Sequence, residues 1–268
     1  MITEKDLNCT VVTALYNIGR EDWPDYKRNW QEYLEYFKNT LSLRSKFVIY
    51  VDSNTYDFVL NERKKIDPDL NYTKIIKKEF NQLPKFYLKD KIDKIMSSAE
   101  YKNGLVDPNP PEYNNSNYSV LILSKMFLVE DAIDKNFYNT DYYMWLDAGI
   151  RHNKFRTEDR FKVYPNPQKI NDINGIRILC RFKPEDSDLD IKSFYKSHKN
   201  RFGAAVIVGK KEHIKEFNIK INEVLEEALD NNLIDSEQSL HTVCYLRNRD
   251  MFELIYNNEW YYHFDYYL

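Results

Sequence analysis

Acidic residues follow two predicted buried strands, at positions where a carboxylate can face a ligand. Asp52 comes directly after the apolar run Lys46–Val51, and Asp147 comes after the aromatic run 141–146. Asp52 could accept hydrogen bonds from a ribose or a base, or it could cap the helix expected next. Asp147 could hold Mg²⁺ or Mn²⁺ together with diphosphate oxygens, because these cations prefer oxygen ligands. A strand-end aspartate can also serve only to satisfy turn amides, so both interpretations remain open.

Three further residues extend this set. Gly149 stands two residues after Asp147 and has no Cβ, so a ligand or metal could approach the backbone there. Asp235 and Glu237 stand at the start of a predicted helix over residues 236–248. Asp235 suits a helix cap, because acidic groups are favoured at helix N-termini. Glu237 could instead act as a general base or hold a sugar hydroxyl.

Histidines and cysteines form no metal or disulfide pattern that the sequence alone reveals. The five histidines include no pair at metal-ligand spacing on one helix, and the three cysteines are odd in number and sparse. The sequence also lacks the G-x-S-x-G elbow, the Walker A loop and the dinucleotide motif G-x-G-x-x-G. These absences disfavour hydrolase, kinase and NAD-dependent functions.

Alternating strands and helices must position these residues. Period-two and apolar runs predict strands over residues 10–16, Lys46–Val51, 71–77, 141–146, 176–182, 203–208 and 251–256. Amphipathic spacing predicts helices over residues 22–41, 55–65, 80–99 with a break near Pro84, 119–134, 210–231 and 236–248. The first of these helices would have Asp22 as N-cap and Pro24 in its first turn. Residues 103–117 and 183–190 are expected to be loops.

This alternation predicts an α/β fold with a mainly parallel central sheet flanked by helices. Ligands of such sheets bind beyond the carboxyl ends of the strands. The expected site therefore lies at residues 16–20, Asp52 and residues 147–152. No repeat and no shift in composition marks a domain boundary, so we expect one domain.

Length, charge and composition narrow the functional class. The chain has 268 residues, and 39 basic against 42 acidic side chains give a net charge of −3, which disfavours a nucleic-acid binder. Tyr is abundant at 22 residues, which fits either AT-rich coding sequence or an aromatic-lined groove that stacks on rings. We see no secretory signal core and no apolar run long enough to span a membrane, so we expect a soluble, cytoplasmic protein.

A resemblance to the HtrL/YibB family is carried by several segments in order. They are TVVTALYNIGR at 10–20, FVIYVD at 47–52, LSKMFLVEDAI at 123–133, TDYYMWLDAGIRH at 140–152, GAAVIVG at 203–209 and IDSEQSLH at 234–241. The resemblance covers about residues 8–256. It implies a single GT-A-like (nucleotide-diphospho-sugar transferase) domain over 1–268. Residues 1–150 would form a nucleotide-binding half, and residues 151–268 an acceptor-side half with a C-terminal aromatic tail.

The resemblance also implies a donor site. Lys125 would approach the diphosphate of a nucleotide sugar, such as a UDP-sugar, from its helix. The nucleotide would be held by Thr13, Tyr16, Arg20 and Asp52. Asp147 and His263 would bind Mn²⁺ or Mg²⁺.

On the acceptor side, the resemblance implies that Glu237 faces the acceptor hydroxyl. Glu237 or Asp235 could serve as the base if the enzyme inverts the anomeric centre, whereas a retaining enzyme needs no such base. GT-A enzymes usually have an Asp-x-Asp motif, and this sequence departs from it, because Gly149 stands in the second acidic position. Lys125, Arg151 or Arg20 could then neutralise the leaving diphosphate in place of a metal.

Two functions from different classes follow. The first is a glycosyltransferase that moves a sugar from a nucleoside-diphosphate sugar to a glycan or another hydroxyl acceptor. The second is a catalytically inactive glycan- or nucleotide-binding module of the same fold, for which the missing second aspartate argues. The sequence does not specify the donor sugar, the acceptor or the oligomeric state.

Overall fold

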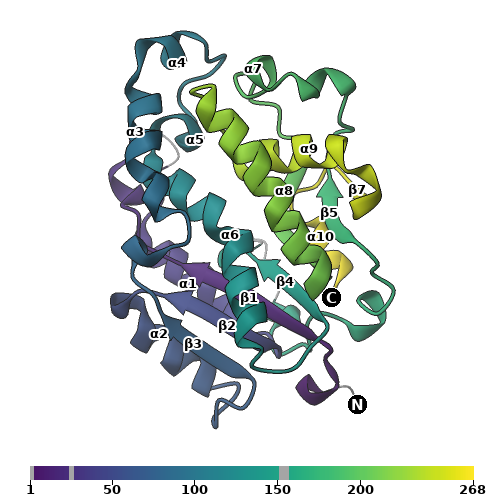
Figure 1. Cartoon of the computed structure of the whole chain (residues 1–268). Coiled ribbons are helices and arrows are strands. Elements are labelled where there is room, and N and C mark those ends of the chain that lie inside the picture. Colours follow the sequence, from purple (N-terminus) through teal and green to yellow (C-terminus); the bar gives the residue numbers. More distant parts are fainter. Residues whose placement is uncertain (1–2, 24–26, 151–156) are drawn as a thin grey trace.

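The computed structural model describes residues 3–23, 27–150 and 157–268, whose strands form one seven-stranded sheet (Figure 1). The order across the sheet is β3-β2-β1-β4-β6-β5-β7. The strands are β1 (Cys9–Leu15), β2 (Lys46–Val51), β3 (Thr73–Lys77), β4 (Tyr142–Leu146), β5 (Ile176–Cys180), β6 (Phe202–Lys210) and β7 (Phe252–Tyr256). Strand β6 runs antiparallel to both of its neighbours, and the other pairs are parallel. The expected α/β class with a mostly parallel sheet is confirmed.

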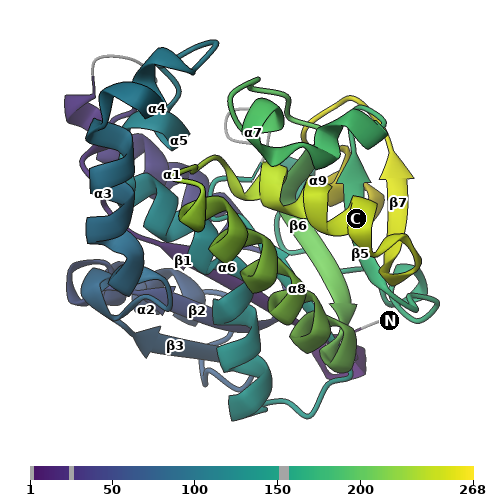
Figure 2. The same cartoon turned by 45° about the horizontal axis from the view of Figure 1, so that its top comes forward.

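Helices cover both faces of the sheet (Figures 1 and 2). One face is covered by α3 (Lys89–Ser97), α6 (Ser116–Lys135), α8 (Lys211–Asp230) and α9 (Glu237–Arg247). The other face is covered by α1 (Trp30–Leu41), α2 (Ser53–Lys64) and α10 (Tyr262–Tyr266). Three short helices, α4 (Ala99–Asn103), α5 (Pro111–Asn114) and α7 (Ile191–Phe194), lie together beyond one end of the sheet in both views.

The central strands are apolar throughout because both of their faces are covered. Every residue of β1 is buried, including its β-branched run from Thr10 to Thr13. Val12 and Ala14 pack toward the α6 side, whereas Val11 and Leu15 pack toward the α1 side. This alternation makes β1 the middle of two cores, which is typical of parallel sheets with helices on both sides.

Six of the seven strands in the described ranges point the same way, so the segments after them meet at one edge of the sheet. These segments follow β1, β2, β3, β4, β5 and β7. Residues 16–20 after β1 and residues 147–150 after β4 are direct neighbours there, because β1 and β4 pair with each other. We refer to this edge as the carboxyl edge.

The first predicted helix begins later than the sequence suggested. Residues Arg20–Asp22 form a single 3-10 turn, and α1 starts at Trp30 rather than at residue 22. Asn29 is the cap: its side chain accepts a hydrogen bond from the Gln31 amide at 2.7 Å, and Glu32 completes a capping box. Pro24, proposed for the first turn, lies outside the described residues.

Other boundaries differ where short helical turns were not foreseen. The segment predicted as a helix over 80–99 begins with two 3-10 turns, Phe80–Gln82 and Phe86–Leu88, before α3 starts at Lys89. Pro84 lies between those turns and prevents one continuous helix. The two predicted loops hold α5 and a 3-10 turn, Asp186–Leu189. Across the ranges that the structure describes, no helix combines the length and apolarity needed to cross a membrane.

Candidate functional site

A buried lysine joins two carboxylates at the carboxyl edge. The Lys125 Nζ lies 2.9 Å from the Asp147 Oδ1 and 2.8 Å from the Glu237 Oε1. Lys125 and Glu237 are nearly buried, at 9% and 5% exposure, while the Asp147 side chain is about one third exposed at 34%. We call these three residues the Lys125 triad. It brings together predicted residues from a helix, a strand end and a helix start.

Each member of the triad is held by its own element. Lys125 lies midway along α6, which is capped by Asn115 accepting from the Tyr118 amide at 3.0 Å. Asp147 directly follows β4, and its amide donates to the Ala205 carbonyl of β6 at 2.8 Å. The indole nitrogen of Trp145 donates to the Asp147 Oδ1 at 2.6 Å, which orients the carboxylate. Glu237 is the first residue of α9, where the helix dipole favours an anion.

Charge pairing decides the ionisation state of the triad. Burial lowers the pKa of Lys125, but the attraction of Asp147 and Glu237 outweighs it, so the net pKa is raised. Burial raises the pKa of Asp147 in turn, and Lys125 opposes that rise. The short distances favour an ionised cluster with one cation between two anions.

A cleft opens beside the triad. It has a volume of about 430 Å³, and its walls include Lys125, Asp147, Gly149, Glu237 and the aromatic residues Tyr118, Trp260 and Tyr261. Arg28 and Gln238 also line it. A Cβ built on Gly149 would lie 3.9 Å from the Tyr36 Cβ and 4.0 Å from the Tyr33 Cε1, which are ordinary contacts. Gly149 therefore borders the cleft without a steric need for glycine.

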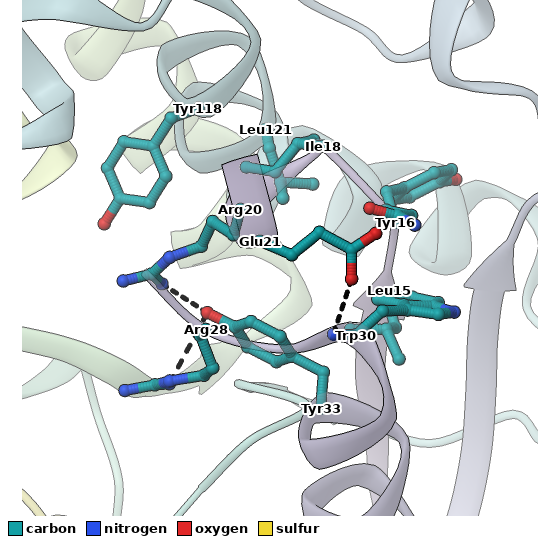
Figure 3. Close-up of a pocket in the computed structure, with 11 residues that line it drawn as sticks. Leu15, Tyr16, Ile18, Arg20, Glu21, Arg28, Trp30, Tyr33, Tyr118 and Leu121 are labelled. Carbon is teal, nitrogen blue, oxygen red and sulfur yellow. Dashed lines mark hydrogen bonds between the residues drawn. The ribbon is translucent and has the colours of Figure 1, made fainter. Parts of the chain in front are cut away.

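A second, smaller hollow of about 80 Å³ lies next to the cleft, at the end of β1 (Figure 3). It contains the predicted residues Tyr16 and Arg20, and it shares Arg28 and Tyr118 with the cleft. Arg20 and Arg28 both donate to the Tyr33 hydroxyl, Arg28 at 3.4 Å. The two guanidinium groups lie over the Tyr33 ring, at 5.6 and 5.0 Å from its centroid. We call this space the β1 hollow.

Two residues expected at the nucleotide occupy structural positions. Thr13 is fully buried inside β1, and its Oγ1 has no hydrogen-bond partner among the described residues. Asp52 is partly exposed and accepts a hydrogen bond from the Thr55 amide at 2.9 Å, which makes it the N-cap of α2. Neither residue lines the cleft or the β1 hollow. For Asp52, the geometry favours the helix-cap alternative.

Asp235 also holds a helix start. Its Oδ1 accepts from the Ser236 amide at 2.6 Å and its Oδ2 accepts from the Ser239 hydroxyl at 2.7 Å. Burial raises the pKa of Asp235 to about 8, so the neutral acid predominates at pH 7. A protonated carboxyl cannot accept a proton, and Glu237 is therefore the better placed of the two candidate bases.

His263 has the chemistry of a metal ligand. Its Nδ1 lies 2.9 Å from the Val206 carbonyl oxygen, which can only accept, so Nδ1 carries the proton. The Nε2 is buried and has no hydrogen-bond partner in the described part of the chain. Burial lowers the pKa of His263 to about 3, so the ring is neutral and Nε2 keeps its lone pair. Metal-bound histidines commonly have this arrangement.

The two predicted metal ligands come from the end of β4 and from α10, and no larger ligand set is described around them. Val206, which binds His263, is the β6 residue paired with Leu146, and Leu146 precedes Asp147. Within residues 3–23, 27–150 and 157–268, no three His, Cys, Asp or Glu side chains are placed to hold one ion. A divalent cation would therefore need ligand atoms from its substrate in addition to Asp147 and His263.

Several residues at this edge were missed by the sequence analysis. Glu112 of α5 is 8% exposed, and burial raises its pKa, with Glu237 adding to the rise and His198 opposing it. Arg28, Tyr118 and Trp260 line the hollows from three different segments. Glu112 lies in a stretch predicted to be a loop, and no local pattern marks it. Arg151, proposed to neutralise a diphosphate, and His152 lie outside the described residues.

Comparisons with known proteins agree on one family. A family model described as "Bacterial protein of unknown function (HtrL_YibB)" matches residues 7–268. The chain is also 26% identical over 257 residues to "Protein HtrL" of Escherichia coli (strain K12), an alignment that covers 92% of this chain and 87% of that protein. The resemblance found in the sequence is confirmed: the chain belongs to the HtrL_YibB family.

Proposed function

We propose that this protein is a glycosyltransferase that moves a sugar from a nucleoside-diphosphate sugar to a hydroxyl of a glycan acceptor. The observation that carries the proposal is the Lys125 triad beside a cleft at the carboxyl edge. Open α/β sheets bind their ligands at this edge. A buried cation there can stabilise the charge that develops on a departing diphosphate.

The β1 hollow supplies the second requirement, a place for the rest of the donor. Its lining is largely apolar and aromatic, with Tyr16, Trp30 and Tyr33 among its walls. Such a lining suits a nucleobase, which offers flat apolar faces. Arg28 lines both the hollow and the cleft, and Arg20 lines the hollow, so their charges would face the phosphates of a donor that spans both spaces.

Glu237 is the residue that would take the acceptor proton. In an inverting reaction, the acceptor oxygen forms a bond to the anomeric carbon while the bond from that carbon to the diphosphate breaks. The electron pair leaves with the nucleoside diphosphate, and the hydroxyl proton passes to a carboxylate. Glu237 lines the cleft, and its carboxylate lies 2.8 Å from the Lys125 Nζ. A retaining course would leave Glu237 to orient the acceptor only.

Mn²⁺ or Mg²⁺ is part of the proposal as a cofactor held by Asp147 and His263. When bound, the cation would neutralise part of the diphosphate charge. The Lys125 Nζ lies 2.9 Å from the Asp147 Oδ1, so the protein itself also places a positive charge beside Asp147.

The test is incubation of the purified protein with UDP- and GDP-sugars, with Mn²⁺ or with EDTA. We expect release of the nucleoside diphosphate and a thermal shift with at least one donor. Lys125→Ala should abolish release. Phe137→Ala should not, because Phe137 is an exposed residue that precedes β4 and therefore lies at the opposite edge of the sheet. Absence of both turnover and thermal shift with every donor would refute the proposal.

One observation favours the inactive binding module as a second candidate. Gly149 stands where the Asp-x-Asp motif of GT-A enzymes has its second acidic residue, and the described residues offer no group of three metal ligands. This candidate predicts that wild-type protein binds a nucleotide or glycan without turnover and that Asp147→Ala still binds it. Turnover by the wild type that is lost in Asp147→Ala would exclude it.

A further inference from the structure

Exposed aromatic side chains gather at the part of the carboxyl edge formed by β5 and β7. Phe182 follows β5 and is 52% exposed, and Trp260 follows β7 and is 39% exposed. The Arg181 guanidinium lies between them, 3.7 Å from the Trp260 ring centroid and 5.2 Å from that of Phe182. We call Arg181, Phe182 and Trp260 the aromatic platform.

Three hydrogen bonds to backbone carbonyls hold the segment that carries Arg181 and Phe182. The amides of Arg181 and Phe182 both donate to the Arg201 carbonyl, at 2.8 and 3.1 Å. The Arg181 Nε donates to the Asn258 carbonyl at 3.1 Å, which ties the β5 segment to the β7 segment. Strands β5 and β7 are paired in parallel up to Cys180 and Tyr256. These bonds fix the backbone beside Phe182 and the Arg181 guanidinium that contacts both rings, which lowers the conformational entropy lost when a ligand binds.

The platform is continuous with the cleft. Trp260 belongs to the platform and also lines the cleft together with Lys125, Asp147 and Glu237. The next residue, Tyr261, lines the same cleft. A molecule that reaches Glu237 from this side would therefore pass over Trp260.

From this continuity we propose that the aromatic platform binds the chain of an oligosaccharide acceptor, several sugar units away from the reacting hydroxyl. This inference rests on the proposed function and names its acceptor class. Pyranose rings have apolar C–H faces that pack on aromatic rings, while their hydroxyls need hydrogen-bond partners. Arg181 lies against both rings, and the polar residues Asn257, Asn258 and Glu259 directly precede Trp260 in the chain.

The surroundings favour a glycan over a lipid or a protein. The two exposed rings are separated by a guanidinium, so they do not form the continuous apolar patch typical of protein partners or membranes. The local charges are mixed: Arg181, Lys183, Glu185 and Asp186 lie close to Phe182 in the chain, and Glu259 directly precedes Trp260. An anionic membrane would require a basic excess instead.

The experiment is a glycan array that displays oligosaccharides beside their constituent monosaccharides, probed with the full chain. We expect wild-type protein to bind oligosaccharides and to show no detectable binding to the monosaccharides. Trp260→Ala and Phe182→Ala should each weaken this binding about tenfold, the size expected for an aromatic contact residue. Phe137→Ala is the matched control: Phe137 is 40% exposed, like Trp260, but precedes β4 rather than following a strand of the carboxyl edge, and it should change nothing.

Several outcomes would overturn the platform. They are wild type that binds no oligosaccharide, equal binding by wild type and both platform variants, and Trp260-dependent binding to phosphatidylglycerol vesicles in place of glycans. Thermal shifts with nucleotide sugars are measured on the same samples. Donor binding without glycan binding refutes the platform and leaves the proposed function, whereas glycan binding without donor binding does the reverse.

Discussion

At the scale of single residues, the Lys125 triad is the feature on which the functional proposal depends. Its three members were each singled out in the sequence, but their contact was not predictable. Lys125 and Glu237 are 112 residues apart, and only the packing of α6 against α9 brings them together. Sequence patterns report which residues lie on an apolar stripe or at a strand end. They do not report which two such residues meet.

Removing the positive charge of Lys125 should destabilise the fold, because the carboxylates of Asp147 and Glu237 would lose their shared partner. In Lys125→Met, Asp147 and Glu237 would face each other with no positive charge between them. We expect a loss of about 2–3 kcal/mol in the free energy of unfolding, below the range for fully buried pairs because Asp147 is partly exposed. Urea unfolding measures this loss. The double variant Lys125→Met with Glu237→Gln should recover part of it. Equal stability of the single and double variants would show that charge is not the cause.

Gly149 can be tested without disturbing the fold. A Cβ at this position would make only ordinary contacts, and its backbone is not in the left-handed region. We therefore expect Gly149→Ala to stay within about 0.5 kcal/mol of wild-type stability. Gly149→Asp would create the second carboxylate of an Asp-x-Asp pair and should enlarge the thermal shift caused by Mn²⁺. A shift that is identical in wild type, Gly149→Ala and Gly149→Asp would argue against metal binding at this edge.

At the scale of elements, strands were predicted better than helix starts. β2 has the predicted bounds, and the other strands differ by a few residues, because buried strands produce apolar runs with clear ends. The start of α1 was placed eight positions too early, at Asp22 and Pro24 rather than at Asn29 and Trp30. Both candidate starts have good capping residues. The choice between them depends on tertiary contacts that a local pattern does not contain.

Asp52 shows how one residue can satisfy two patterns. A carboxylate after a buried strand was expected either at a nucleotide or as a helix cap, and the structure shows the cap. Asp52→Ala should lower the free energy of unfolding by about 1 kcal/mol, the usual cost of losing an N-cap. Asp52→Asn keeps a side-chain oxygen for the Thr55 amide and should retain most of that stability. If Asp52→Asn also retains the donor-induced thermal shift, the residue is a cap only, and a lost shift would restore the nucleotide role.

At the scale of the whole molecule, one edge of the sheet brings together candidate site residues that are spread over more than two hundred residues of the sequence. The direction of the strands was predictable from their alternation with helices, and this placed the site at the carboxyl edge. The antiparallel strand β6 was not predicted, and it has a consequence for the site. Its reversed direction sets Ala205 against Asp147 and Val206 against Leu146, and Val206 in turn holds His263. The C-terminal helix α10 is thereby brought to the strand next to Asp147.

Buried titratable groups on α9 and at its start should shape the pH dependence of stability for the entire fold. Burial lowers the pKa of His241 to about 3 and raises the pKa of Asp235 to about 8. Between about pH 3 and 6.5 the unfolded chain binds a proton at His241 that the folded protein does not, so this residue makes stability rise with pH. Between about pH 4 and 8 the folded protein holds a proton at Asp235 that the unfolded chain releases, so this residue makes stability fall with pH.

The two opposing slopes overlap between about pH 4 and 6.5 and separate on either side of that window. Above pH 6.5 only the Asp235 contribution remains of the two. Asp235→Asn should therefore remove the decline in stability from pH 6.5 to 8. The asparagine side-chain oxygen can still accept the hydrogen bond from the Ser236 backbone amide. Below pH 6.5 His241→Gln should make the protein lose less stability on acidification than wild type. Urea midpoints at half-unit pH steps measure both slopes. If Asp235→Asn leaves the slope between pH 6.5 and 8 unchanged, Asp235 is not the group that holds the extra proton in the folded state, and the assignment fails.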